Sequence, residues 1–357
     1  MTATRAVITG WGMYAPERVM TNEDLSKLVD TTDEWIRTRT GIRERRIAAE
    51  GETTATLSTL AARDALAVAG VDATEVDLVI VATASPDYLM PATGVLVARD
   101  LGATRAAGFD LNAACSGFVF GLATGASFVS GGLYRQVLVV GVDLLSRYLD
   151  WTDRNTCVLF GDGAGAVLLS ASEGSGGLLG VQLFSDGTGE EGIIIPGGGT
   201  AHPATEETVR DRMHFMRMAG KEVYRYATRQ LAETTQAAVR EAGLRMTDID
   251  LFLYHQANLR ILETVRDLLG IPGDKVFVNL DRYGNTSAAS VPMALVEAVA
   301  AGRVQVGDRL LMGAFGAGYT AGAAVVEWTA DPSRFLLAPG EQTRAGQPRR
   351  EPVAAGT

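Results

Sequence analysis

Cysteine and histidine are scarce in this chain, which has two cysteines and three histidines among 357 residues. Two cysteines without a pairing pattern do not form a disulfide framework, so we expect a protein of a reducing compartment. The most apolar stretch is interrupted by Gly125, Gly131 and Arg135, so it does not match a membrane-spanning helix. The N-terminal residues also lack the apolar core of a signal peptide. We therefore predict a cytoplasmic protein with no membrane partner.

Positive charge is also in short supply, because the formal net charge is −10. Non-specific binding of nucleic acid needs a basic surface, so we predict no nucleic-acid partner. An acidic partner would have to be bound by a local basic patch rather than by the field of the whole protein. A hydrophobic content of 47% with 21% charged residues is typical of a globular protein with a large core.

Cys115 is the first of three polar residues in unusual surroundings. It opens a long run of small and apolar residues, which predicts a buried helix that begins there. The free N–H groups and the dipole at a helix start lower the pKa of a thiol, so we expect a reactive thiolate. Cys157 lies within the apolar run TCVLF, and we expect it to be a core residue of a strand.

His255 and Asn285 complete this set of three. His255 ends a strand-like apolar run, and the carboxyl ends of strands are where α/β proteins build their sites. A thiolate, an imidazole and an amide are what acyl transfer through a thioester needs, for attack, for charge movement and for oxyanion binding respectively. The alternative is that Cys115, His255 and Asn285 are unrelated core residues.

The two halves of the sequence resemble each other. Residues 73–84 and 246–257 each combine a polar lead-in with an apolar strand, and each is followed by an Asp, a candidate site residue and a helix of small residues. A repeat of this length indicates a duplicated α/β unit. Apolar strands that alternate with helices indicate sheets covered on both faces. We predict an α/β fold with five α-β-α-β-α layers, whose two halves meet at the active site.

We place the halves at residues 1–174 and 175–330, and we predict a disordered tail over 331–357, where apolar periodicity ends. The glycine-rich run GDGAG at 161–165 superficially suggests a phosphate loop. The residues after it are typical of a strand and not of the helix start that a dinucleotide site requires, so we interpret the run as structural.

From Val7 to about Trp328 the chain resembles the β-ketoacyl-acyl carrier protein synthase III family of the thiolase-like fold. The segments that carry the resemblance are Cys115 with its neighbours, TDEWIRTRTGI at 32–42, FGDGAGA at 160–166, HQANLRI at 255–261, GNTSAASVP at 284–292 and FGAGYT at 315–320. Relatives of the same fold carry a Cys, His or Glu where Asn285 stands, so this residue points to the type III branch.

The resemblance implies a two-stage reaction that starts fatty acid or polyketide synthesis. Cys115 would take an acyl group from acyl-CoA, and the enolate formed by loss of CO₂ from malonyl-acyl carrier protein would attack it. His255 and Asn285 would stabilise that enolate, and the N–H groups of Cys115 and Gly318 would form the oxyanion hole for acylation. The thioesters of CoA and of the carrier protein would be substrates, and neither a cofactor nor a metal is implied.

The resemblance also implies contacts for the two carriers. Trp35 and Arg154 would hold the CoA adenine between them, and Arg39 and Asn258 would bind elsewhere on CoA. The sequence provides a basic helix face, with Lys221, Arg225 and Arg229 at intervals of four. Such a face is often only a solvated surface.

Arg225 and Arg260 match positions that bind the acidic carrier protein in this family. Asp267 and Leu268 stand where some members have two lysines, which would weaken or shift the patch. Members of the family are homodimers, and the segment at 87–93 matches a loop that walls the acyl pocket of the partner. Met90 and Phe160 would line this acyl pocket.

Three other functions are compatible with the same residues. One is an acyltransferase, or the priming synthase of a polyketide pathway, in which only recognition of the acceptor differs. Another, from a different class, is a thiol hydrolase with a Cys-His-Asn triad, although the duplicated α/β pattern argues against it. The last is an inactive interaction protein, which the presence of all three polar residues disfavours.

Overall fold

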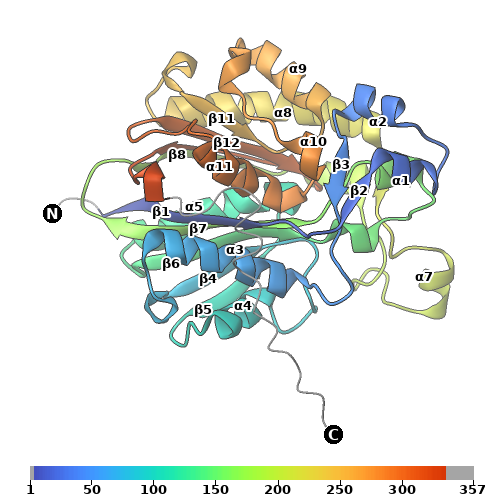
Figure 1. The fold of residues 1–357 in the computed structure, drawn as a ribbon, viewed down its shortest axis with the longest axis horizontal. Helices are drawn as coiled ribbons and strands as arrows, with labels where there is room; N and C mark the ends of the chain where they lie inside the picture. Colours follow the sequence, from blue (N-terminus) through green and yellow to red (C-terminus); the bar gives the residue numbers. More distant parts are fainter. Residues whose placement is uncertain (1–3, 335–357) are drawn as a thin grey trace, which may run out of the picture.

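Two β-sheets in separate layers carry the fold of this protein, which we describe for residues 4–334 of a computed structural model (Figure 1). The first sheet has the strand order β1-β7-β6-β4-β5 and the second the order β11-β12-β13-β8. Their strands are β1 (Arg5–Tyr14), β4 (Leu78–Ala82), β5 (Ala107–Leu111), β6 (Gln136–Asp143), β7 (Gly163–Ser172), β8 (Gly177–Phe184), β11 (Leu251–Tyr254), β12 (Arg309–Gly316) and β13 (Thr320–Glu327). Two small sheets pair β2 (Val19–Thr21) with β3 (Glu44–Arg46) and β9 (Ile193–Ile194) with β10 (Arg217–Met218).

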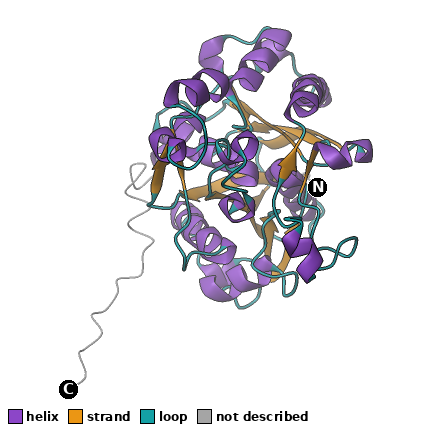
Figure 2. Ribbon diagram, turned by 90° about the vertical axis from the view of Figure 1, so that its right-hand side faces the viewer, coloured by secondary structure: helices purple, strands orange, loops and turns teal. Residues whose placement is uncertain are grey.

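Helices cover both faces of each large sheet (Figures 1 and 2). They are α1 (Asn22–Ser26), α2 (Asp33–Thr40), α3 (Thr54–Ala69), α4 (Thr93–Leu101), α5 (Gly117–Ser130), α6 (Arg154–Cys157), α7 (Glu206–Arg210), α8 (Gly220–Glu241), α9 (Leu259–Leu269), α10 (Leu280–Tyr283) and α11 (Ser290–Ala300). Helices α3 and α4 lie outside the first sheet, α8 and α9 outside the second, and α5 and α11 between the two. The predicted five-layered thiolase-like architecture is therefore confirmed.

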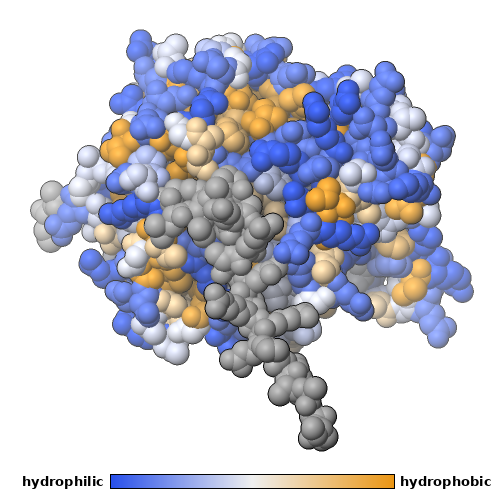
Figure 3. All heavy atoms as spheres, in the orientation of Figure 1, coloured by the Kyte–Doolittle hydropathy of each residue, from blue (hydrophilic) through white to orange (hydrophobic). Residues whose placement is uncertain are grey.

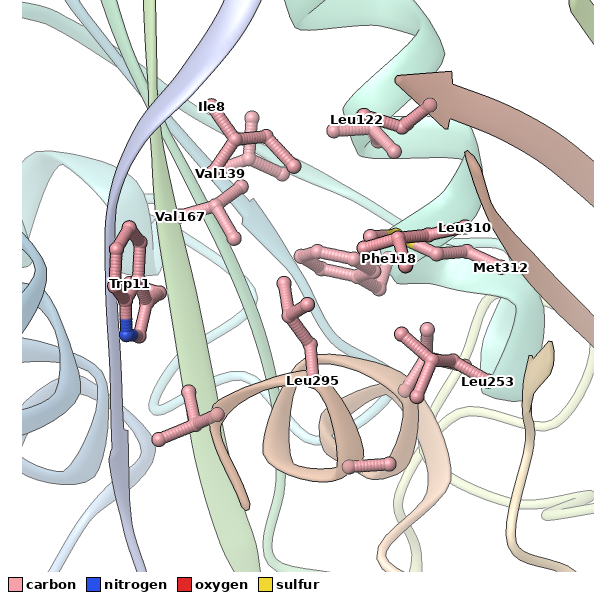
Figure 4. Packing of buried hydrophobic residues seen from close by; sticks show 14 of the residues in the cluster. Ile8, Trp11, Phe118, Leu122, Val139, Val167, Leu253, Leu295, Leu310 and Met312 are labelled. Atoms are coloured by element: carbon pink, nitrogen blue, oxygen red, sulfur yellow. The ribbon is translucent and has the colours of Figure 1, made fainter. Parts of the chain in front are cut away.

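The sequence explains why α5 and α11 take the central layer. Both helices are apolar around most of their circumference, and such helices are stable only when they are covered on all sides. Glycines bring α5 close to the first sheet: a Cβ at Gly121 would lie 3.0 Å from Val139. Figure 4 shows Phe118 and Leu122 of α5 packed among side chains from both sheets, such as Val139 and Met312. One hydrophobic core thus joins the two halves.

The pairing of the strands repeats between the halves. In the first sheet β4 and β6 are parallel, while β6 with β7 and β7 with β1 are antiparallel. The second sheet repeats this with β11 and β12 parallel, and with β12, β13 and β8 antiparallel. Where β5 would have its counterpart, the second half has a single parallel bridge between Phe252 and Val276. This repetition agrees with the expected duplication.

Two local predictions need correction. Cys157 is buried as expected, but it ends the short helix α6 instead of lying in a strand, because the Asp153 side chain caps that helix on the Asn155 N–H. Pro332–Arg334, which we assigned to the disordered tail, form a 3₁₀ turn in which the Asp331 carboxylate accepts the N–H of Ser333. The remainder of that predicted tail, 335–357, lies outside the described residues.

Other predictions agree with the structure or stay open. The glycine-rich run at 161–165 leads into β7, as predicted, and does not precede a helix. The proposed boundary at residue 174 falls between β7 and β8, and the division into two halves stays a prediction. None of the helices within residues 4–334 has the length and apolar character that crossing a membrane requires. On the face shown in Figure 3, hydrophilic side chains surround separate apolar patches.

Candidate active site

A cavity of about 440 Å³ lies between the two halves and brings the three predicted residues together. Cys115 comes from the first half, and His255 and Asn285 come from the second. All three are buried, with at most 8% of their surface exposed. The structure therefore contradicts the alternative that these are unrelated core residues.

Cys115 lies at a strained turn between β5 and α5. The turn begins at Ala114, whose φ of 47° lies in the left-handed region and whose N–H donates to the Asn112 side chain at 3.1 Å. Cys115 is the middle residue of the 3₁₀ turn η2 (Ala114–Ser116), and α5 begins at Gly117. A helix does start here, as the small-residue run predicted, and backbone strain of this kind is common at functional sites.

The predicted low pKa of Cys115 is wrong. Burial raises the pKa of the Cys115 thiol to about 12, while a hydrogen bond from the Ser287 hydroxyl at 3.3 Å lowers it and the Asp143 carboxylate raises it. The start of α5 does not compensate for removing a thiolate from water. Cys115 is therefore a neutral thiol at rest, and its proton has to leave when the sulfur attacks.

His255 follows the last residue of β11 and is buried at the cavity wall. Its Nδ1 forms a hydrogen bond of 2.6 Å with the Ser290 hydroxyl, and the Phe315 ring packs edge-on at 5.3 Å. Burial lowers the pKa of His255 to about 3, so the imidazole is neutral. With Nδ1 engaged, Nε2 is the nitrogen left for the cavity, where it can accept or donate a proton according to the tautomer.

Asn285 is held by its backbone and by its side-chain oxygen. Its N–H donates to Leu159 at 2.9 Å, and its carbonyl accepts from Gly161 at 3.0 Å. Its Oδ1 accepts the Ser287 N–H at 2.9 Å. Because Oδ1 is engaged, the Nδ2 amide is the group left to donate into the cavity, which is what binding of an enolate oxygen requires.

The structure does not place Gly318 at the cavity, although we predicted an oxyanion-hole role for it. Ala317 lines the cavity instead. Gly318 and Tyr319, with φ values of 65° and 44°, lie in the turn that leads from β12 into β13. The glycine required for close approach is Gly316, where an added Cβ would lie 2.7 Å from the Cys115 nitrogen.

The inner wall of the cavity is aliphatic. Phe160 lies on it as predicted. Met90, which we expected to wall the acyl pocket of the partner subunit, is 84% exposed on this chain, and its role stays a prediction. Sequence reasoning missed the other members of this wall, for which the apolar run at 193–195 was the available signal. They are Leu145, Ile193, Ile194, Ile195, Met216 and Met218, most of them on or beside β9 and β10. The cavity is thus suited to an apolar chain.

A second cleft of about 670 Å³ continues from this cavity. The two share Leu159, Gly220, Tyr224 and Asn258. All the residues predicted to contact CoA or the carrier protein line this cleft, namely Trp35, Arg39, Arg154, Asn258, Arg225 and Arg260. Two predicted binding regions thus form one continuous surface that ends at Cys115.

The predicted adenine sandwich is not open in this structure. The guanidinium carbon of Arg154 lies 4.9 Å from the centre of the Trp35 ring, and that of Arg39 lies 4.4 Å from it. Arg154 stacks directly on the indole, which leaves no space for a third ring between them. Arg154 also donates to the Asp30 carbonyl at 2.7 Å, so this bond has to break if Arg154 moves to admit a base.

Several cations of the cleft are available for anionic ligands. Arg39, Lys221, Arg225 and Arg260 are exposed, and none forms an ion pair with any residue in the described range 4–334. By contrast, Arg229 pairs with Glu233 at 3.6 Å and does not line the cleft. The Asp267 carboxylate, which we expected to weaken the patch, is paired with Arg266 at 2.7 Å. A local basic surface therefore exists on an acidic protein.

Comparisons with known proteins agree with this geometry. Residues 109–187 match the family model of 3-oxoacyl-[acyl-carrier-protein] synthase III, and residues 239–328 match the model of its C-terminal part. The chain is 52% identical to the β-ketoacyl-[acyl-carrier-protein] synthase III of Roseiflexus sp. strain RS-1 over 328 residues, which are 92% of this chain and 100% of that one. The corresponding enzyme of Desulfitobacterium hafniense is 52% identical over 322 residues, 90% of this chain and 97% of the relative.

Solved structures show the same similarity. The 3-oxoacyl-[acyl-carrier-protein] synthase III of Aquifex aeolicus superposes with a TM-score of 0.84 at 44% identity, covering 90% of this chain and 100% of its own. A priming β-ketosynthase of a polyketide biosynthetic pathway superposes with a TM-score of 0.85 at 39% identity, covering 92% and 97%. On the identity and coverage of these relatives, the chain belongs to the β-ketoacyl-acyl carrier protein synthase III family.

Proposed function

We propose that this enzyme condenses an acyl-CoA starter with malonyl-acyl carrier protein, with loss of CO₂, to give a β-ketoacyl-acyl carrier protein. The observation that carries the proposal is the single cavity in which Cys115, His255 and Asn285 meet beside an aliphatic wall. An apolar wall next to a thiol, an imidazole and an amide accommodates an acyl chain while its thioester is exchanged.

In the first half-reaction the sulfur of Cys115 attacks the acyl-CoA carbonyl. Because thiol and imidazole are both neutral at rest, the thiol proton passes to Nε2 of His255 as the carbon–sulfur bond forms. We assign the oxyanion hole to the N–H groups of Cys115 and Ala317, because both residues line the cavity, and Ala317 thus takes the role that we first gave to Gly318. Collapse of the tetrahedral intermediate releases CoA thiolate, which takes up the proton.

In the second half-reaction the malonyl thioester loses CO₂, and the electrons of the broken carbon–carbon bond move to the thioester oxygen as an enolate. After acylation the proton of the neutral His255 ring moves from Nδ1 to Nε2, and Nδ1 then accepts from the Ser290 hydroxyl. In this tautomer Nε2 of His255, together with Nδ2 of Asn285, donates a hydrogen bond to the enolate oxygen. The enolate carbon then attacks the acyl carbon on Cys115. The carbon–sulfur bond to Cys115 breaks, the product leaves on the carrier protein, and the Cys115 thiolate takes up a proton from solvent.

We assign the second cleft, which continues from the cavity at Cys115, to the phosphate-bearing arms of CoA and of the carrier protein. Trp35, Arg39, Arg154 and Asn258 are the CoA contacts, while Arg225 and Arg260 meet the carrier. Since the Arg154 guanidinium stacks on Trp35, binding of the base between them requires the guanidinium to move off the indole.

Arg260→Glu is expected to lower the rate with the carrier protein about tenfold while acyl-CoA use changes little, because the exposed cation has no partner within the described chain. The defect should shrink as salt is added, because the contact is screened. Arg229→Glu makes the same charge change outside the cleft and is the matched control. Rates measured with each substrate varied separately test this. A salt-independent defect, or one confined to CoA, would place the carrier site elsewhere.

We further propose a homodimer in which the loop at 87–93 walls the acyl pocket of the partner subunit. Tyr88, Leu89 and Met90 are 60%, 89% and 84% exposed on the single chain, and three consecutive large apolar side chains in water favour a covered surface. Met90 is unbranched and flexible, so it accommodates more than one acyl shape. We therefore expect short acyl-CoAs to be accepted, along with somewhat longer or branched ones.

Met90→Phe should narrow this range, lowering rates with the longer acyl-CoAs by about tenfold relative to the shortest. Rates across a series of acyl-CoAs, with the mass of the protein measured in solution, decide the matter. Leu89→Phe adds an aromatic ring at the neighbouring exposed position and serves as the control. If the Met90 side chain only fills space, Met90→Phe will lower the stability of the protein and leave its preference for acyl-chain length unchanged. A monomer with full activity would show that the loop at 87–93 does not form a wall of the partner's acyl pocket.

A second candidate function is favoured by one observation. The structural similarity to a priming β-ketosynthase supports a starter enzyme of a polyketide pathway, with the same chemistry on Cys115. Intact-protein mass spectrometry after exposure to a mixed acyl-CoA pool identifies the acyl group that the enzyme selects. Release of CO₂ that depends on both acyl-CoA and malonyl-acyl carrier protein supports condensation, whereas acyl transfer or hydrolysis without CO₂ release would overturn it.

A further inference from the structure

Ser287 has no part in the reaction described so far, yet its hydroxyl is bonded to the reacting sulfur. It donates to the Cys115 sulfur at 3.3 Å, and the residue is only 1% exposed. Ser287 opens the 3₁₀ turn η7 (Ser287–Ala289) with a φ of 52°, a conformation that serine rarely adopts. In the duplicated fold this turn corresponds to η2, so Ser287 stands where the first half has Ala114.

The turn that carries Ser287 also contacts a buried carboxylate, because the N–H of the next residue, Ala288, donates to Asp143. Asp143 is fully buried at the end of β6, and burial raises the pKa of its carboxyl while the nearby Ser287 hydroxyl lowers it. The carboxylate accepts hydrogen bonds at 2.8–3.2 Å from Thr83, Ala84, Ser85 and Ala288. This number of donors is typical of an ionised carboxylate, because a protonated one would have to donate a hydrogen itself.

We propose that Ser287 is a positioning residue that donates its hydroxyl proton to the Cys115 sulfur while this is a thiolate, and to Asp143 once the sulfur carries an acyl group. This inference rests on the proposed role of Cys115 as nucleophile. A serine hydroxyl has one proton and can serve one acceptor at a time. A thiolate is a strong acceptor, whereas the sulfur of a thioester is a weak one, so acylation releases the proton to the carboxylate.

The position of the Ser287 hydroxyl offsets a repulsion between the Cys115 thiolate and the Asp143 carboxylate. Asp143 and His255 are the titratable groups around Cys115, one a carboxylate and the other a neutral imidazole. A thiolate close to a buried carboxylate is repelled by it. The shared hydroxyl provides the sulfur with a hydrogen bond at the moment when its negative charge develops, and it keeps the carboxylate satisfied for the rest of the cycle.

Alkylation of Cys115 by iodoacetamide tests this without acyl-CoA or carrier protein, so its result is separate from that of the condensation assay. Peptide mass spectrometry distinguishes Cys115 from Cys157. Between about pH 7 and pH 9 the rate should follow the thiolate fraction and rise with pH. Loss of a hydrogen bond to a charged group is worth roughly one pKa unit, so Ser287→Ala should be alkylated about tenfold more slowly throughout this range.

Two further variants separate the hydroxyl from the backbone. Ser287→Gly removes the hydroxyl and relieves the positive φ, so it should be slowed as much as Ser287→Ala. Ser116→Ala removes a buried hydroxyl next to Cys115 that is bonded to the Thr320 carbonyl at 3.2 Å and not to the sulfur, and it should react at the unmodified rate. Wild-type alkylation in both Ser287 variants would overturn the proposal, as would slowing in Ser287→Ala that Ser287→Gly restores.

Discussion

Cys115→Ala is expected to abolish acyl transfer, with a loss of at least about 10⁴-fold, because no other group in the cavity can form the thioester. The fold should survive, because alanine replaces a small buried residue at a turn where small residues already lie on both sides. Intact-protein mass after incubation with acyl-CoA is the measurement, and circular dichroism verifies the fold.

The control for this variant is Cys157→Ala, which removes the other free thiol from a fully buried position outside the cavity. It should still gain the mass of one acyl group. Cys115→Gln places an amide where the acylated sulfur would be and is expected to release CO₂ from malonyl-acyl carrier protein without condensation. Acylation of Cys115→Ala would show that the nucleophile lies elsewhere.

Asn285→Ala should separate the two half-reactions. Loss of the Nδ2 donor removes a hydrogen bond that forms only when the enolate develops, so decarboxylation and condensation should fall about 10²- to 10³-fold. Acylation of Cys115 should persist, because Asn285 has no part in that oxyanion site. Single-turnover acylation and CO₂ release, measured on the same preparation, give the two rates.

A second substitution separates this role from a structural one. Alanine also removes Oδ1, which accepts the Ser287 N–H at 2.9 Å, and an unsatisfied buried N–H costs about 1–3 kcal/mol. Asn285→Asp keeps that acceptor for the Ser287 N–H and loses the amide donor, so it should be as deficient in condensation as the alanine variant. Equal losses in acylation and condensation would mean that Asn285 serves both steps.

The layered fold was predictable because its signals are local and repeated. Continuous apolar strands and all-apolar helices at corresponding places in both halves leave few arrangements that bury every apolar face. The counterpart of β5 was not predictable in the same way, since the second half has a single bridge at Phe252 and Val276 where the first has a strand. Local sequence does not determine how far such a pairing extends.

The meeting of Cys115, His255 and Asn285 in one cavity was also predictable, because thiols and imidazoles are few in this chain and these residues follow strand-like runs. The pKa values of these residues were not predictable. The helix start at Cys115 predicted a low pKa, but burial has the larger effect and depends on residues from the other half. The prediction for Gly318, where Ala317 lines the cavity instead, failed for a similar reason. The φ values of the residues in a turn set its path, and this sequence permits several sets of φ values.

The contact between the two halves at the active site has a consequence for how such a protein can evolve. Asp143 ends a strand of one half and accepts the N–H of Ala288 in the other at 3.2 Å, so neither duplicated unit can form this site by itself. The turns η2 and η7 of the two halves can therefore act together only while the halves stay docked. We therefore expect a substitution on one side of this contact to require a matching substitution on the other.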